Sequence, residues 1–397
     1  MRVCLVTPIL APYVLVGGIN HYVATLADAL AKKGHRVTVV GHDLHTQHVY
    51  EPTRRVEPYG ESVAVPFFSI AGHWKGPDFR NFRAAMGIRK FLRQNAREFD
   101  IVEASNWLGH GAFIAQTGLP LVTRISTPSM ESLDDTWGVR HLNWLEGRSC
   151  RRADHLIGHS EEILALAAQM YDCGSVPSTV IPLGIPDAIA ENAVLSTERV
   201  DVLCIGRAEH RKGTDILLRA LLEVFAAAPS LHVTFIGANM RAYLDARPTE
   251  NRVWKELIGR YEDRIHDLGL VSQEEKHRLI ASSHYVVVPS RFESFGLVVP
   301  EAMRGGTPVI AAAGGALATI TPMGPGNALY ADPEDATSLA ALMIARALLG
   351  PQRAIEKRDA TRVAYEEHFS MHHFVDKTID TYGSILAQRT RSHRLAS

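Results

Sequence analysis

The stretch VVVPSRFESFGLVVPEAMRGGTPVIAAAGG, residues 286–315, decides the fold. It opens with a short run of β-branched residues and closes with a second apolar run, TPVIAAA (307–313). Between these runs, a loop leads into a short helix that is predicted to begin near Gly296 and to end at Gly305-Gly306. A strand, a helix and a second strand in this order form the repeating unit of a parallel sheet that helices cover.

The same alternation of apolar runs and helical patterns continues along the whole chain. Further strands are predicted over 3–7, 36–41, 99–105, 120–126, 155–160, 200–206, 232–237 and 284–290, and helices over 21–34 and about 214–228. Short β-branched runs between helices are typical of parallel sheets buried on both faces. The pattern loosens between 181 and 198 into proline, glycine and polar residues and then restarts.

We therefore predict an α/β protein with two Rossmann-like domains, each built on a parallel sheet. The N-terminal domain is predicted to span 1–185, and a linker follows over 186–199. The C-terminal domain is predicted to span 200–371. The last helical stretch, about 372–397, is expected to return to the N-terminal domain and complete it.

Composition and charge narrow the class of protein. A formal net charge of −1 over 397 residues gives no electrostatic reason to expect a nucleic-acid partner. The four cysteines lie far apart without C-x-x-C pairing, so we expect no zinc site and a reducing, cytoplasmic compartment. No run approaches the ~18–20 apolar residues of a membrane span. Residues 1–10 are predicted to form a buried strand rather than a signal peptide, because prolines interrupt the apolar run.

The segment FRNFRAAMGIRKFLRQNAR, residues 79–97, is rich in arginine and lysine and contains no acidic residue. Apolar side chains are interleaved with the basic ones. Two interpretations follow from this pattern: a peripheral contact with an anionic membrane, here the inner face, or the solvated face of a helix. The solvated face is the simpler of the two.

Two glutamates in the 286–315 stretch are the first candidates for binding a ligand. Ligands of open parallel sheets bind at the carboxyl ends of the strands, where the loop with Glu293 is predicted to lie. Glu301 is placed in the early turns of the helix that follows. A carboxylate accepts two hydrogen bonds from neighbouring hydroxyls, so Glu301 suits a ribose and Glu293 a group beyond a diphosphate. Solvated or helix-capping glutamates are the alternative for each residue taken alone.

A second cluster lies in LCIGRAEHRKGT, residues 203–214. Gly206 ends a predicted strand, and Arg207 and Lys212 follow in the loop that opens a helix. Two fixed cations at this place suit a diphosphate leaving group, because they neutralise the charge that develops on it. The string does not satisfy the Walker A pattern. A solvated basic loop is the alternative.

Weaker signals lie in the first half of the chain. The pair Gly17-Gly18 follows the first predicted strand and permits either a close backbone approach to a ligand or a tight turn. It lacks the G-x-G-x-x-G spacing of a dinucleotide-binding dehydrogenase. Asn106, Trp107 and His110 follow the predicted strand over 99–105 and are candidates for contact with a ligand, and no histidine has H-E-x-x-H zinc spacing.

These segments together resemble glycosyltransferase family 4, the retaining transferases of GT-B fold. Glu293 and Glu301 match the family's E-x7-E motif within a P-S-x-x-E-x-F-G context. Arg207 and Lys212 match its G-R-x-x-x-x-K-G motif, and the early glycine pair matches as well. The resemblance covers essentially the whole chain and is densest over 200–315.

The resemblance implies a deep cleft between an acceptor-binding N-terminal domain and a donor-binding C-terminal domain. It implies a nucleoside-diphosphate sugar as donor, most simply of UDP or GDP, with no metal ion and no cofactor. The donor-binding residues it implies are Gly17, Gly18, Gly206, Arg207, Lys212, Glu293, Ser294, Phe295, Gly296, Leu297 and Glu301. Asn106, Trp107 and His110 remain the candidates for acceptor contact.

Two positions depart from the family pattern. After the predicted strand over 120–126, the family commonly has a histidine beside the reacting centre, and this chain has Ser126. The family's G-G-x-P-E segment is here Gly-Gly-Ala-Leu-Ala over 314–318 and lacks the glutamate. The resemblance implies four catalytic residues, which are Glu293, Arg207, Lys212 and, at the position of the histidine, Ser126. Donor binding is expected to be retained, because neither departure removes the phosphate cations or the two glutamates.

The resulting functional prediction is a retaining, metal-independent, hexosyltransferase-like enzyme. Its expected acceptor is a small polar molecule, a natural product or a lipid-linked glycan. Two alternatives stay open at this point: a sugar-nucleotide epimerase or hydrolase on the same scaffold, and a catalytically silent binder of sugar nucleotides. Fold alone does not separate the three.

Overall fold

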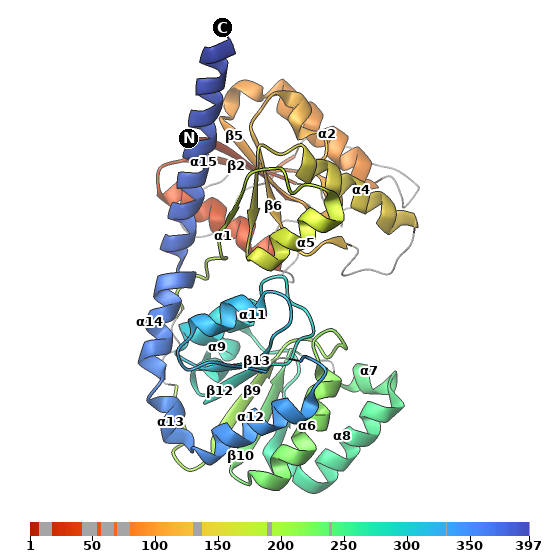
Figure 1. The fold of residues 1–397 in the computed structure, drawn as a ribbon, viewed down its shortest axis with the longest axis vertical. Coiled ribbons are helices and arrows are strands. Elements are labelled where there is room, and N and C mark those ends of the chain that lie inside the picture. The colour runs from red at the N-terminus through yellow and green to blue at the C-terminus, as the bar shows by residue number, and fades with distance from the viewer. Residues whose placement is uncertain are drawn as a thin grey trace. The chain divides into compact units, whose positions relative to one another are not determined.

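The computed structural model describes residues 1–7, 18–41, 54–56, 67–69, 80–129, 137–188, 193–237, 240–330 and 332–396. The chain divides into two compact units (Figure 1). Unit 1 consists of Met1–Gly184 together with Met371–Ser397, and unit 2 consists of Ile185–Ser370. Each unit is built on its own sheet.

Unit 1 contains an eight-stranded sheet in the order β3-β4-β2-β1-β5-β6-β7-β8. Its strands are β1 Arg2–Thr7, β2 Arg36–Gly41, β3 Arg54–Val56, β4 Phe67–Ser69, β5 Ile101–Ser105, β6 Leu121–Ile125, β7 His155–Gly158 and β8 Ser178–Val180. All neighbouring pairs are parallel except β3 and β4. Every residue of β5 and β6 is buried, as expected of central strands covered on both faces.

Helices cover the sheet of unit 1. They are α1 Gly18–Lys32, α2 Arg80–Gln94, α4 Trp137–Arg151, α5 Glu161–Tyr171 and α15 Met371–Ala396, with short 3₁₀ turns at Ala96–Glu98, Trp107–Gly109 and Ile114–Thr117. The start of α5 shows the local chemistry that sets a helix end. Ser160 Oγ accepts a hydrogen bond from the Ile163 amide, and Glu161 and Glu162 lie in the positive first turn.

Unit 2 contains a six-stranded, fully parallel sheet in the order β11-β10-β9-β12-β13-β14. Its strands are β9 Val200–Ile205, β10 Leu231–Ile236, β11 Ile265–Asp267, β12 Tyr285–Val288, β13 Val309–Ala312 and β14 Ala328–Tyr330. Its helices are α6 Thr214–Ala227, α7 Met240–Asp245, α8 Pro248–Tyr261, α9 Gln273–Ala281, α10 Val298–Arg304, α11 Leu317–Ile320, α12 Ala336–Leu348, α13 Pro351–Ile355 and α14 Arg358–Phe369. The core of this unit joins side chains of α6 and α12 to those of β9, β10, β12 and β13.

The long helix α15 belongs to unit 1 although it ends the chain (Figure 1). A buried ion pair joins Arg124 of β6 to Glu103 of β5, with the two hydrogen bonds at 2.7 and 2.9 Å. Tyr382 of α15 donates to the same carboxylate at 2.7 Å. The buried charge of Glu103 thus receives its third donor from α15, which anchors the helix to the sheet.

The predicted α/β fold with two parallel sheets is confirmed. The strands predicted from β-branched runs are present, with boundaries within two residues of those expected. The strands that the sequence pattern missed are β3, β4, β8, β11 and β14, each three residues long. Runs this short are too brief to show a periodicity.

Candidate active site

Two loops of unit 2 leave the same edge of its sheet. The loop over 206–213 follows β9, and the loop over 289–297 follows β12. Because β9 and β12 are parallel neighbours, the loops after their carboxyl ends meet. The structure therefore brings together the two clusters of residues that the sequence analysis selected separately.

The contact between these loops is so close that it requires glycine. Gly213, the N-cap of α6, has φ +68°, and a Cβ there would lie 1.8 Å from the carbonyl oxygen of Pro289. Gly315 has φ +57°, and its Cβ would lie 2.4 Å from the carbonyl oxygen of Glu293. Side chains at either position would separate the backbone segments that carry the candidate residues.

Glu293 lies at the centre of the site and is largely buried. Its Oε1 accepts hydrogen bonds from Lys212 Nζ at 2.5 Å and from Ser290 Oγ at 3.0 Å. The guanidinium of Arg211 lies 3.7 Å from Oε2. Arg211 also lies 3.6 Å from Glu209, which pairs with Arg207. These three cations and two carboxylates carry a net charge of +1, which suits an anionic ligand. Sequence reasoning did not select Arg211 or Ser290, although Arg211 precedes Lys212 directly and Ser290 lies three residues before Glu293.

Arg207 has a more open position. Its side chain is 69% exposed and pairs with Glu209 at 2.8 Å. Together with Gly206 and Lys212 it lines a small pocket above the end of β9. Arg207 can therefore reach a ligand in this pocket without breaking any buried contact.

Glu301 lies in the first turn of α10, as predicted. Its carboxylate accepts a hydrogen bond from Lys276 of α9 at 2.7 Å, and both side chains are mostly buried. One carboxylate oxygen is therefore engaged by the ammonium group, and the other is available to hydroxyl donors. The sequence analysis did not select Lys276, because it is one of several charged residues in α9 and belongs to no motif.

The residues between the two glutamates form the approach to α10. Ser294, Phe295, Gly296 and Leu297 all lie in the loop after β12. Phe295 is buried and meets Phe369 edge-on at 6.1 Å between ring centroids. Gly296 has φ +79°, which is favourable for glycine and reverses the chain just before the helix.

In unit 1, Asn106 and Ser126 follow the neighbouring strands β5 and β6. Asn106 Oδ1 accepts hydrogen bonds from the Ser126 amide at 2.7 Å and from Ser126 Oγ at 2.9 Å. Both residues are buried, and so is His110, whose Nε2 lies 3.3 Å from Asn81 Oδ1. Of the three candidates for acceptor contact, Trp107 is the one with partly exposed surface.

A buried carboxylate that sequence reasoning missed holds these loops. Glu146 of α4 accepts hydrogen bonds from the amides of Leu108 at 3.0 Å and Ser129 at 3.1 Å, and from Tyr171 Oη at 2.5 Å. Leu108 has φ +62°, an unusual conformation for leucine that these contacts stabilise. Burial raises the pKa of Glu146, although its hydrogen bonds act in the opposite direction.

One predicted site residue lies outside the described part of the chain, and the predicted membrane contact is not tested by the structure. Gly17 lies outside the described residues, and Gly18 is the first residue of α1. In α2, Lys90 and Arg93 are exposed, and Arg97 just beyond the helix is exposed as well; membrane contact through this segment stays a prediction. Among the residues that the structure describes, no cluster could hold a metal ion. In the same part of the chain, no helix is long and apolar enough to cross a membrane.

The fold resembles those of several solved structures. A sucrose-phosphate synthase from Thermosynechococcus elongatus superimposes with a TM-score of 0.72 at 21% identity, covering 97% of this chain and 99% of the other. Anabaena HepE in complex with UDP and glucose has a TM-score of 0.67 at 18% identity, covering 97% and 100%. These similarities identify the GT-B fold.

Sequence comparison gives the family. Residues 16–188 match Glycosyltransferase Family 4, and residues 199–347 match Glycosyl transferases group 1. A D-inositol 3-phosphate glycosyltransferase of a Nocardioides species is 27% identical over 92% of this chain and 85% of the relative. A glycogen synthase of Mycobacterium tuberculosis is 26% identical over 87% and 86%. The chain belongs to glycosyltransferase family 4, which confirms the resemblance seen in its motifs.

Proposed function

We propose that this glycosyltransferase transfers a sugar from a nucleoside-diphosphate sugar with retention of configuration and without a metal ion. The observation that carries the proposal is the contact between Lys212 and Glu293 at 2.5 Å. This contact supports the proposal, because a cation suited to a diphosphate lies directly beside a carboxylate suited to sugar hydroxyls. The structural relatives support such a donor, because HepE was solved with UDP-glucose and a starch synthase of Arabidopsis thaliana with ADP and acarbose.

In this proposal the donor lies along the two loops of unit 2. Glu301 binds the ribose hydroxyls, and the amides around Gly296 face the phosphates. Arg207 and Lys212 neutralise the diphosphate, while Glu293 binds hydroxyls of the sugar. The acceptor, a sugar, small polar molecule, natural product or lipid-linked glycan, binds unit 1 near Trp107.

The chemical step then needs no protein nucleophile. The bond between the sugar C1 and the β-phosphate oxygen breaks, and the acceptor oxygen bonds to C1 on the same face. The acceptor proton moves to a phosphate oxygen of the departing nucleoside diphosphate. Negative charge grows on that phosphate in the transition state, so fixed cations lower the barrier more than they strengthen ground-state binding.

Product analysis with a panel of UDP-, GDP- and ADP-sugars, with and without acceptors, tests this function. Nucleoside diphosphate that appears only with acceptor, together with a product of unchanged anomeric configuration by NMR, supports it. Activity should persist in EDTA. An altered donor without acceptor would instead show an epimerase or hydrolase. Tight binding without turnover would show a silent binder, the alternative that Ser126 in the place of the family's histidine favours.

The two glutamates should separate binding from turnover. We expect Glu301→Ala to weaken nucleoside-diphosphate binding, because it removes the ribose ligand. Glu293→Ala should lower kcat far more than it changes the affinity for nucleoside diphosphate, which lacks the sugar. Calorimetry for binding and steady-state kinetics for turnover measure the two effects. Wild-type affinity in both variants would contradict the assignment of this site to the nucleotide.

A further inference from the structure

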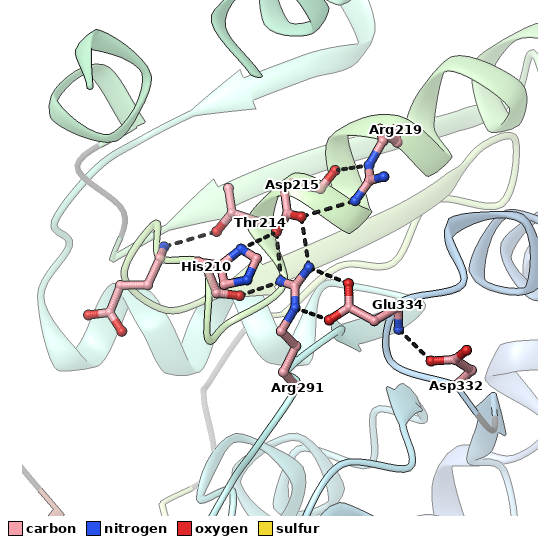
Figure 2. Close-up of polar contacts among 8 residues, drawn as sticks. His210, Thr214, Asp215, Arg219, Arg291, Asp332 and Glu334 are labelled. Atoms are coloured by element: carbon pink, nitrogen blue, oxygen red, sulfur yellow. Dashed lines mark hydrogen bonds and ion pairs between the residues drawn. The ribbon is translucent and has the colours of Figure 1, made fainter. Parts of the chain in front are cut away.

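The guanidinium of Arg291 joins three segments of unit 2 (Figure 2). Nη1 and Nη2 donate to the two carboxylate oxygens of Asp215 at 2.7 and 2.8 Å. Nη1 also donates to the carbonyl oxygen of His210 at 2.5 Å. Nε and Nη2 donate to Glu334, the latter at 2.7 Å. All five N–H donors of the side chain are thus used.

These contacts are well shielded at their centre. The side chains of Arg291 and Asp215 are 14% and 8% exposed, whereas Glu334 lies at the rim and is 59% exposed. A bidentate arginine–carboxylate pair with so little solvent access has a fixed geometry. Arg291 is therefore a rigid point to which the neighbouring segments are attached.

The attached segment is the loop that carries the candidate phosphate ligands. Arg291 holds it at two consecutive carbonyl groups, because its side chain binds the His210 carbonyl and its amide donates to that of Arg211 at 2.9 Å. Lys212 is the next residue along the chain. Asp215, the third attachment, lies in the first turn of α6, just after the loop. The loop is thus fixed on both sides of Lys212.

We propose that Arg291 is a positioning residue that holds Arg211 and Lys212 in place for the terminal phosphate of the bound nucleotide. This inference rests on the proposed donor site. It adds Arg291 to that site as a residue that is neither one of the two glutamates nor a ligand of the phosphates. Arg291 makes no contact with the ligand in this arrangement. Its effect passes through the backbone of the loop.

Arg291→Lys tests the inference, because lysine keeps the charge but has three donors on one nitrogen, and so it cannot reproduce the five contacts of the planar guanidinium. Arg219→Ala is the matched control. Arg219 contacts the same Asp215 carboxylate at 3.0 Å from its other side, and it is 53% exposed (Figure 2). Arg219 reaches Asp215 from within α6, so Arg219→Ala leaves every contact of Arg291 in place.

The measurement is calorimetry with UDP, GDP, ADP and the matching monophosphates. For the diphosphate that the wild type binds, we expect Arg291→Lys to raise Kd about tenfold or more. The monophosphate Kd should rise less than about threefold, since it lacks the phosphate nearest Lys212. Arg219→Ala should bind both ligands as the wild type does. Equal losses for both ligands, or wild-type binding in Arg291→Lys, would overturn the inference.

Two further outcomes are covered by the same design. If Arg291→Lys does not fold, Glu334→Gln loosens the same network from its exposed rim. It should weaken diphosphate binding several-fold without weakening monophosphate binding, and no change would overturn the inference. If the wild type binds none of the three diphosphates, the proposed donor site itself falls, and this inference falls with it.

Discussion

Arg207 is more exposed than the other cations of the candidate site, and this makes it the cleanest residue for testing charge stabilisation. Its side chain is 69% exposed, so Arg207→Ala should leave the fold intact. If Arg207 meets the leaving diphosphate, its loss should cost on the order of 3 kcal/mol, about a hundredfold in kcat/KM. Steady-state kinetics with saturating acceptor measures the change.

Arg199→Ala is the control for this substitution. Arg199 is 52% exposed and pairs with Asp201 at 2.9 Å, so it matches Arg207 in chemistry and exposure. It precedes β9, whereas the site lies beyond the carboxyl end of that strand. Near-wild-type kcat/KM in Arg207→Ala, or an equal loss in Arg199→Ala, would exclude a specific role of Arg207.

At the same scale, the sequence predicted the residue types of the site better than their contacts. Lys212 and Glu293 were selected for different parts of the donor, and the structure pairs them across 81 positions of sequence. They meet because β9 and β12 are neighbours in the sheet. The local periodicity of a sequence predicts strands but not their order in a sheet. Lys276 and Glu146 were missed for the same reason, since each acquires its importance from a distant partner.

At the scale of elements, the return of α15 to unit 1 depends on a buried charge. Tyr382→Phe removes the hydroxyl that donates to Glu103 and leaves that carboxylate with Arg124. A buried charged acceptor that loses one donor should cost about 1–3 kcal/mol of the free energy of unfolding. Denaturant titration followed by circular dichroism measures this loss.

Tyr365→Phe serves as the matched comparison for α15. Tyr365 is equally buried and donates at 2.8 Å to the carbonyl oxygen of Ile185, a neutral acceptor within unit 2. Its loss should cost less than that of Tyr382, because hydrogen bonds to charged groups are the stronger ones. A smaller effect in Tyr382→Phe than in Tyr365→Phe would show that the Glu103 contact does not anchor the helix.

The length and burial of a strand determine whether the sequence pattern predicts it. Central strands such as β5 and β12 are buried on both faces, so their apolar runs are unmistakable. The missed strands β3, β8 and β14 have three residues each and lie at or near the edges of the sheets. Their pairing depends on a neighbour that is already in place, and three residues carry no signal of it.

At the scale of the whole molecule, the stability of unit 1 should depend on pH through a histidine that folding buries. His159 is 4% exposed, and its ring lies 6.0 Å from that of Tyr22. Burial, together with the nearby charge of Arg124, lowers the pKa of His159 from 6.5 to about 3. The folded protein thus keeps this imidazole neutral at pH values where the unfolded chain protonates it.

The sign of the effect follows from proton binding. Between pH 6.5 and about 3 the unfolded state binds more protons at His159 than the folded state, so stability falls as the pH falls. The slope for one such group is about 1.4 kcal/mol per pH unit, or about 2 kcal/mol between pH 7 and pH 5. Above pH 6.5 the contribution is complete and constant.

His159→Gln should therefore flatten the dependence of unfolding on pH. We expect the difference in unfolding free energy between pH 7 and pH 5 to shrink by about 2 kcal/mol relative to the wild type, whatever the variant's stability at pH 7. His372→Gln is the control, because the side chain of His372 in α15 is 79% exposed and is therefore not buried by folding. An unchanged pH dependence in His159→Gln would mean that acid destabilises the molecule through other groups.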